Sequence, residues 1–101
     1  MVDTWAGRSQ FTYAGSVRTG TEITYGDGNH VSVSAAQYQA LINNFAGQVV
    51  DVTPSRTDAG AGSLEEWFQN NVTQTAIASY VAPILIREGV ATRTDNNQLQ
   101  F

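Results

Sequence analysis

A change in hydrophobic period between residues 22 and 45 is the feature that most constrains the fold of this chain. Residues 22–25 and 30–33 alternate polar and apolar side chains, which is typical of half-buried strands. Residues 26–29 between them read Gly-Asp-Gly-Asn, and because these residue types tolerate positive φ they favour a tight hairpin. From residue 34 onward the apolar spacing becomes helical. The chain is therefore predicted to combine a β-hairpin with helices.

The first helix is predicted directly after this hairpin. Ser34 and Gln37 have the spacing of a capping box, in which the side chains satisfy free backbone N–H groups at the start of a helix. Gly47 follows as a stop, because glycine enters the left-handed conformation without steric cost. The apolar residues between them recur at i, i+3, i+4 and i+7 and form one stripe: Tyr38, Leu41, Ile42 and Phe45.

Two further helices are predicted in the second half of the chain. Ser63 and Glu66 repeat the capping-box spacing and open the second helix. Thr73 is the expected N-cap of the third helix, and Pro83 is expected to kink or break it because proline removes a backbone donor. The third helix is predicted to bury Ile77, Tyr80, Val81 and Ile84 and to turn Gln74, Thr75, Ala78, Ser79 and Ala82 outward.

The remaining segments complete an α+β fold. Residues 48–53 are predicted to form a short buried strand, followed by a loop. Strands over 90–94 and 98–101 are predicted to enclose a turn at 95–97. The chain stops on the last of these strands, so we expect its carboxylate at a sheet edge.

A single domain is predicted over residues 9–101. It consists of a β-hairpin region at 9–33, which includes a strand near Phe11 and Tyr13, and a helical unit with a C-terminal hairpin at 34–101. Residues 1–8 are expected to form a loose N-terminal arm. A length of 101 residues suits one hydrophobic core.

Composition speaks against several classes of protein. The chain has no cysteine, so disulfides and thiolate zinc sites are excluded, and with one histidine we expect no metal and no cofactor. The longest apolar run, residues 80–86, is too short to cross a bilayer. No basic-then-apolar leader opens the chain, so we expect no membrane partner and a cytoplasmic location by default.

The charge balance is acidic and its cations are scattered. The chain has five arginines, no lysine and nine acidic residues, for a net charge of −4. Strong non-specific binding to nucleic acid needs clustered cations, because phosphate neutralisation supplies most of that affinity. The composition therefore argues against strong non-specific binding to nucleic acid or anionic membranes. The arginines stand at positions 8, 18, 56, 87 and 93.

The order helix, strand, helix, turn, helix, hairpin from residue 34, with the pattern over residues 73–94, resembles the winged helix-turn-helix family. Gly89 and Arg93 match the glycine that ends the recognition helix and the basic residue of the wing. The resemblance implies a DNA-reading helix in the major groove. Its contact residues, for DNA or another partner, would be Gln74, Thr75, Ser79, Arg87 and Arg93. The chain departs from the family at Pro83 and in having no cation on that helix before Arg87.

A possible anion site precedes the second helix, where free N–H groups and the helix dipole attract negative charge. Its residues would be Arg56, Gly60, Gly62 and Ser63. A phosphate-binding loop needs a lysine that this chain lacks, and Glu65 and Glu66 would compete with a bound anion. The favoured interpretation is a structural loop with a capped helix.

No group of residues indicates catalysis. His30 at the hairpin is interpreted as a solvated turn histidine, because a general base needs converging partners. Glu65 and Glu66 are better explained by stabilisation of the helix N-terminus than as paired catalytic acids. Four N-terminal aromatic residues are either core or an exposed contact patch: Trp5, Phe11, Tyr13 and Tyr25.

The leading hypothesis is a small non-catalytic binding module that contacts another protein or a copy of itself. Its expected surfaces are the N-terminal hairpin and the outward face of residues 73–82. The alternative is a winged-helix DNA-binding or regulatory domain, and an enzyme comes third.

Overall fold

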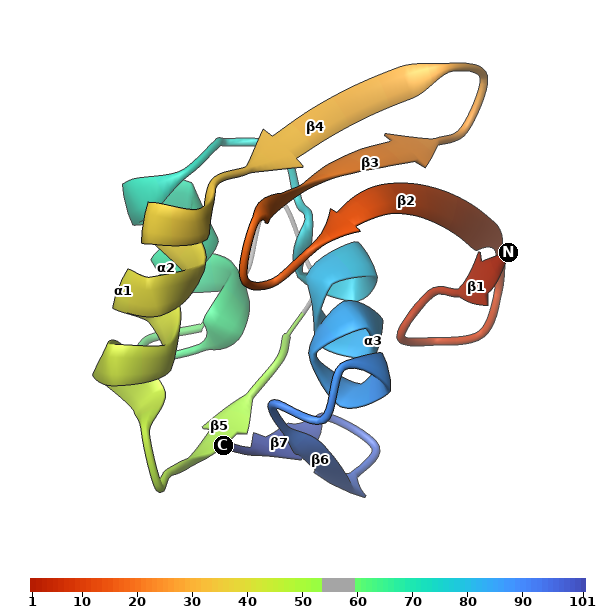
Figure 1. Ribbon diagram of the computed structural model, residues 1–101. Coiled ribbons are helices and arrows are strands. Elements are labelled where there is room, and N and C mark those ends of the chain that lie inside the picture. The colour runs from red at the N-terminus through yellow and green to blue at the C-terminus, as the bar shows by residue number, and fades with distance from the viewer. Residues whose placement is uncertain (54–59) are drawn as a thin grey trace.

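Two antiparallel sheets and three helices make up the fold (Figure 1). The structure is a computed structural model that describes residues 1–53 and 60–101. The predicted α+β class is confirmed. The strands are β1 (Val2–Asp3), β2 (Gln10–Ser16), β3 (Gly20–Tyr25), β4 (Asn29–Val33), β5 (Val49–Asp51), β6 (Thr92–Asp95) and β7 (Gln98–Gln100), and the helices are α1 (Ala35–Phe45), α2 (Leu64–Asn71) and α3 (Ala78–Arg87).

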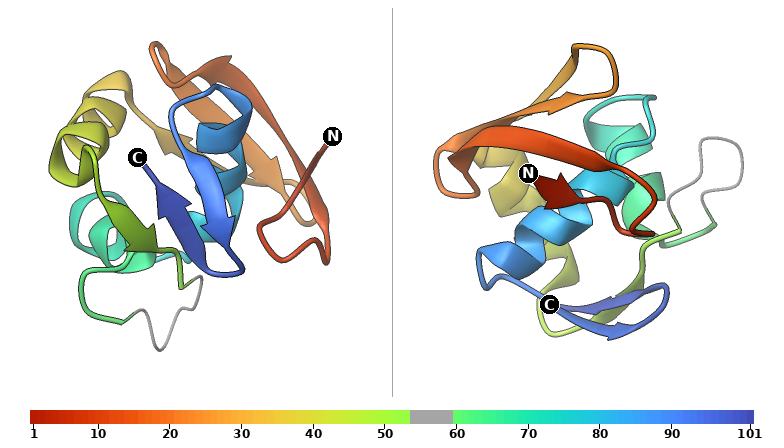
Figure 2. Two further views of the ribbon diagram at one scale, coloured as in Figure 1. Left: turned by 90° about the horizontal axis from the view of Figure 1, so that it is seen from below. Right: turned by 90° about the vertical axis from the view of Figure 1, so that its right-hand side faces the viewer.

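The larger sheet has the strand order β1-β2-β3-β4. The predicted hairpin joins β3 to β4, with Tyr25 paired to Asn29 across the turn and positive φ at Gly26 and Gly28. Its inner face packs on the helices, which lie between this sheet and the small C-terminal sheet (Figures 1 and 2). The alternation read from the sequence therefore marks the two faces of the sheet.

Helix α1 begins and packs as its sequence predicts. The Ser34 side chain accepts the Gln37 N–H, and the Gln37 side chain accepts the Ser34 N–H, which completes the capping box. Tyr38, Leu41 and Phe45 are buried on one face. Ile42 is partly buried and packs against the same core.

The small sheet has the order β5-β7-β6, so the last strand lies at its centre. The expectation that the terminal carboxylate lies at a sheet edge is wrong, because the chain ends on the central strand. Gln100 faces Val49 on one side and Thr92 on the other. Because β5 supplies a second neighbour, the last strand is paired along both sides.

Helix α3 starts at Ala78, not directly after Thr73. The Thr73 hydroxyl oxygen accepts the Thr75 N–H at 3.2 Å, which holds this segment in a local turn. Pro83 was expected to kink or break the helix; it lies inside one continuous helix, so the break is absent. Proline cannot donate to the carbonyl four residues earlier, that of Ser79, and this oxygen instead accepts the Trp5 N–H at 2.9 Å.

That bond fastens the N-terminal segment to α3, whereas residues 1–8 were expected to form a loose arm. Trp5 is 5% exposed, and its indole N–H donates to the Asn96 carbonyl oxygen at 2.9 Å. Ala78 and Ala82 are fully buried, so the prediction that they face outward is wrong. The helix is covered on the side expected to be free.

The N-terminal aromatic residues belong to the core and its margin. Phe11 is buried, and its ring meets Tyr80 edge-on at 5.4 Å between centroids. Tyr25 stacks on Tyr80 at 4.6 Å, and Tyr13 is partly buried against the same core. The alternative of an exposed aromatic patch is therefore not what the structure shows.

Candidate functional site

The expected contact residues at the start of the third helix do not form a free reading face. Gln74 lies before the helix, and its side-chain amide donates to the Gln69 carbonyl oxygen at 3.0 Å. Thr75 belongs to the turn that Thr73 caps. Ser79 is partly buried, and its carbonyl oxygen holds Trp5. Gln74 and Thr75 are held by local bonds and Ser79 holds the N-terminal segment, so the three residues have different surroundings.

Arg93 also has a structural role. Its guanidinium carbon lies 3.8 Å from the centroid of the Trp5 ring, a cation–π contact. All three side-chain nitrogens donate to backbone carbonyl oxygens: Nη1 to Trp5 at 3.0 Å, Nη2 to Asn96 at 3.0 Å and Nε to Asp95 at 3.3 Å. This arginine joins the β6–β7 turn to the N-terminal segment, and three of its five N–H donors are used in doing so.

Arg87 lies beside Arg93 but in different surroundings. Both arginines line a depression of about 250 Å³ between β1 and the end of α3, together with Val2, Pro83 and Ile86. Val2 and Arg87 also line a neighbouring hollow that Met1 enters. Within residues 1–53 and 60–101, Arg87 makes no ion pair. We call Met1, Val2, Pro83, Ile86 and Arg87 the Ile86 surface.

A second cavity, of about 460 Å³, lies where the β2–β3 turn, α1 and the end of α3 meet. It is lined by apolar residues, by Gln39 and by two side chains of opposite charge, Arg18 and Glu88. Glu88 accepts the Tyr13 hydroxyl at 3.0 Å through Oε2 and the Val17 N–H at 2.9 Å through Oε1. Sequence reasoning did not single out either residue, because neither lies in a motif.

The expected anion site is occupied by the protein itself where the structure describes it. The Gly62 N–H donates to Glu66 Oε1 at 2.9 Å, and the Ser63 hydroxyl oxygen accepts the Glu66 N–H at 3.1 Å. The Ser63 N–H donates to the Gly60 carbonyl oxygen at 3.3 Å. Arg56 lies outside the described residues. The observed bonds favour the capped-helix interpretation, with Glu66 as the capping carboxylate.

Glu65, which was interpreted as stabilising the N-terminus of its own helix, is fully buried. Its Oε1 accepts the Ala78 N–H at 3.2 Å, which supplies the cap that Ile77 cannot give to α3. Oε2 is buried and has no hydrogen-bond partner among the described residues. Burial raises the pKa of the Glu65 carboxyl, and the N–H groups of Ala78 and Ile77 lower it in part. The available signal was its position three residues before buried Phe68, on one face of the helix.

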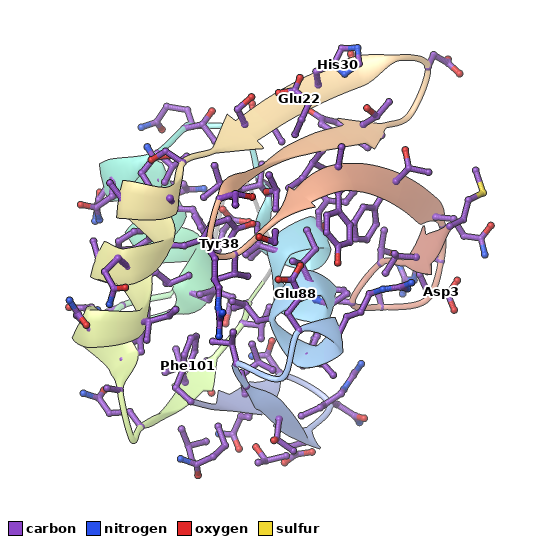
Figure 3. The ribbon with its side chains drawn as sticks, viewed as in Figure 1. Asp3, Glu22, His30, Tyr38, Glu88 and Phe101 are labelled. Carbon is purple, nitrogen blue, oxygen red and sulfur yellow. The ribbon has the colours of Figure 1, made fainter. Side chains whose placement is uncertain are left out.

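The polar cluster around His30 does not form a catalytic arrangement. His30 Nδ1 lies 3.1 Å from the Thr24 hydroxyl and 3.8 Å from Glu22 Oε1, on the exposed outer side of the hairpin (Figure 3). The Ser32 hydroxyl donates to Glu22 and not to the imidazole. The histidine is therefore not placed to activate that hydroxyl.

No helix in the described part of the chain is both long and apolar enough to span a bilayer. Among the same residues, no three His, Cys, Asp or Glu side chains gather as metal ligands would. Comparisons with protein-family models, curated proteins and solved structures find no match for this chain.

Proposed function

We propose that this chain is a non-catalytic binding module that contacts another protein through the Ile86 surface. The observation that carries the proposal is the placement of its exposed apolar side chains. Met1 is 85% exposed and Ile86 37% exposed, and they are two of the three large apolar side chains exposed among the described residues. Clustered exposed apolar groups are typical of interaction surfaces. Val2 and Arg87, which line both hollows, connect the two.

Arg87 defines the chemistry of the partner. A guanidinium without an ion pair in the described structure, next to an exposed isoleucine, suits a carboxylate beside an apolar side chain. The nearby Asp3 carboxylate is engaged by the Gln10 side-chain amide at 3.0 Å. The proposed partner is therefore a protein segment that places an apolar residue on Ile86 and an acidic residue on Arg87.

The alternative is a winged-helix DNA-binding domain. It is supported by the element order from α1 to β7 and by Arg87 and Arg93 lining one depression. Against it stand the bonds of Arg93 to backbone carbonyl oxygens and the burial of Ala78 and Ala82. Protein contact is the better-supported use of this surface.

The proposal is tested with a peptide array in which apolar and acidic residues are varied independently. We expect the bound peptides to combine both types, and Ile86→Glu and Arg87→Glu to lower binding by at least tenfold, because each removes one complementary contact. Arg8→Glu is the matched control, since Arg8 is exposed and does not line either hollow. Equal binding by Arg87→Glu would contradict the proposed partner chemistry.

A parallel titration with mixed duplex DNA at low and near-physiological salt tests the alternative. Salt-sensitive binding that Arg87→Ala abolishes would favour DNA. No binding even at low salt would exclude non-specific DNA affinity as the function.

A further inference from the structure

The cavity between the β2–β3 turn, α1 and the end of α3 has the properties of a small-molecule site. Its volume of about 460 Å³ falls in the range of ligand pockets. Its walls come from three separate parts of the chain, which the fold brings together. It does not share a lining residue with the Ile86 surface.

Hydrogen bonds made by Glu88 fix one wall of this cavity. The carboxylate lies between α3 and the β2–β3 turn (Figure 3), where it accepts the Tyr13 hydroxyl and the Val17 N–H. These two bonds join the end of α3 to β2 and the residue that follows it. Each carboxylate oxygen has a second acceptor position, so Glu88 can still receive a donor from a ligand.

The charges of the cavity are opposite and not paired with each other. Arg18 and Glu88 line the same space, yet they do not form an ion pair within 4.0 Å. Arg18 is exposed, and the structure of residues 1–53 and 60–101 gives it no ion pair. A negatively charged molecule would be attracted by Arg18 but repelled by the Glu88 carboxylate. A positively charged molecule would be attracted by Glu88 but repelled by Arg18.

Apart from Gln39, whose side-chain amide donates to Asn43 Oδ1 at 3.0 Å, the remaining lining residues are apolar or glycine. Val17, Ile42 and Val90 contribute their side chains, and Gly89 leaves open space beside them. A ligand that satisfies all of these groups carries an ammonium, a carboxylate and an apolar body within a small volume. We propose that this cavity binds a free α-amino acid with an apolar side chain, its carboxylate on Arg18 and its ammonium on Glu88.

The experiment uses L-leucine as the probe and two analogues that each lack one charge. Leucine amide keeps the ammonium, and N-acetylleucine keeps the carboxylate. We expect amide NMR shifts of Val17, Gly89 and Val90 to move with leucine, and each analogue to bind about tenfold more weakly, because each loses one charge-assisted contact.

Variants of the two charged residues complete the test. Arg18→Gln should weaken leucine about tenfold and leave leucine and leucine amide equal in affinity or nearly so, because the carboxylate has then lost its cationic partner. Glu88→Gln is the second variant, and Arg8→Gln is the control, because Arg8 lies outside the cavity. The fold of each variant is checked by its NMR spectrum without ligand.

The outcomes separate clearly. Leucine-specific shifts at the cavity that Arg18→Gln weakens and Arg8→Gln does not would support the proposal. An absence of shifts at millimolar leucine would overturn it. Equal binding of leucine and either analogue would also overturn it, because one charge alone would then suffice.

Discussion

Replacing Glu65 by glutamine tests whether the folded protein holds this buried carboxyl in its protonated form. Glu65 is 0% exposed, with one oxygen on the Ala78 N–H and the other without a partner in the described structure. Burial raises the pKa of the carboxyl above its ordinary value, because the charged form loses its hydration. The folded state therefore retains the Glu65 proton to a higher pH than the unfolded chain does.

The sign of the pH dependence follows from this difference. Between the ordinary pKa of a glutamate, about 4.3, and the raised pKa of the folded state, the folded protein binds more protons at Glu65 than the unfolded chain. The contribution of Glu65 to the free energy of unfolding is thus fully present below that window and falls as pH rises through it. Glu65→Gln keeps an oxygen for the Ala78 N–H and cannot ionise. We expect its stability relative to the native protein to rise from acidic to mildly alkaline pH.

The size of the cap contribution is measured with Glu65→Ala. This variant leaves the buried Ala78 N–H without its acceptor, at about 1–3 kcal/mol, and removes one buried methylene, at about 0.8 kcal/mol. The expected loss is about 2–4 kcal/mol, a large part of the stability of a domain of this size, on the order of 5–15 kcal/mol. This loss should appear at acidic pH, where native Glu65 is protonated.

Urea unfolding is followed by tryptophan fluorescence at acidic, neutral and mildly alkaline pH. It gives the free energies of unfolding of the native chain, Glu65→Gln and Glu65→Ala, provided that the m-values agree. Because other carboxylates titrate equally in each protein, the difference between Glu65→Gln and the native chain isolates Glu65. A difference that stays constant with pH would refute the raised pKa. A loss below about 1 kcal/mol in Glu65→Ala would refute the capping role, because that loss is smaller than the cost of a bare N–H.

Three further predictions concern the packing of the N-terminal segment, a glycine and a buried phenol. Trp5→Ala should cost about 3–5 kcal/mol in urea unfolding, and Arg93→Ala should add less in that background than alone, because the two residues share their contact. Gly15→Ala should lower the thermal midpoint of unfolding more than Gly7→Ala does. Both glycines have positive φ, but an added Cβ at Gly15 would lie 2.2 Å from the Gly20 carbonyl oxygen, whereas an added Cβ at Gly7 would meet open space. Burial raises the pKa of Tyr38 to about 12, so its contribution to stability is lost as pH rises from about 10 towards that value, and Tyr38→Phe should remove one late-ionising phenol from an ultraviolet titration.

The elements that sequence reasoning predicted are those whose determinants lie close together in the chain. The β3–β4 hairpin depends on residues 26–29, and the start of α1 depends on Ser34 and Gln37. In each case, backbone groups form hydrogen bonds with residues nearby in the sequence, and no distant contact replaces these bonds. The alternation and the helical stripe then identify the buried faces.

The start and exposed side of α3 could not be predicted in the same way. A hydroxyl at Thr73 suits an N-cap, but the actual cap comes from Glu65 on the preceding helix. Ala78 and Ala82 suit either side of a helix, and their burial depends on what packs against them. Pro83 was correctly marked as a lost donor. The partner of the freed carbonyl oxygen is Trp5, 74 residues earlier than Ser79 by their numbers, and no local pattern indicates it.

Arg87 and Arg93 were both predicted to contact DNA or a partner, but the structure places them in different surroundings. A DNA-binding surface gains its affinity from several cations at once. For each phosphate neutralised, the logarithm of the binding constant falls by about 0.9 per tenfold rise in salt, and a DNA-binding protein can make about 6–10 such contacts. Arg93 already donates to three carbonyl oxygens and has two N–H groups left, so it could meet a phosphate only in the orientation that its contacts with Trp5 impose. Arg87 is not held in this way, but one cation gives little affinity for a polyanion. Because Arg87 lies beside an exposed isoleucine, we propose that it pairs with a single acidic side chain of a protein partner instead.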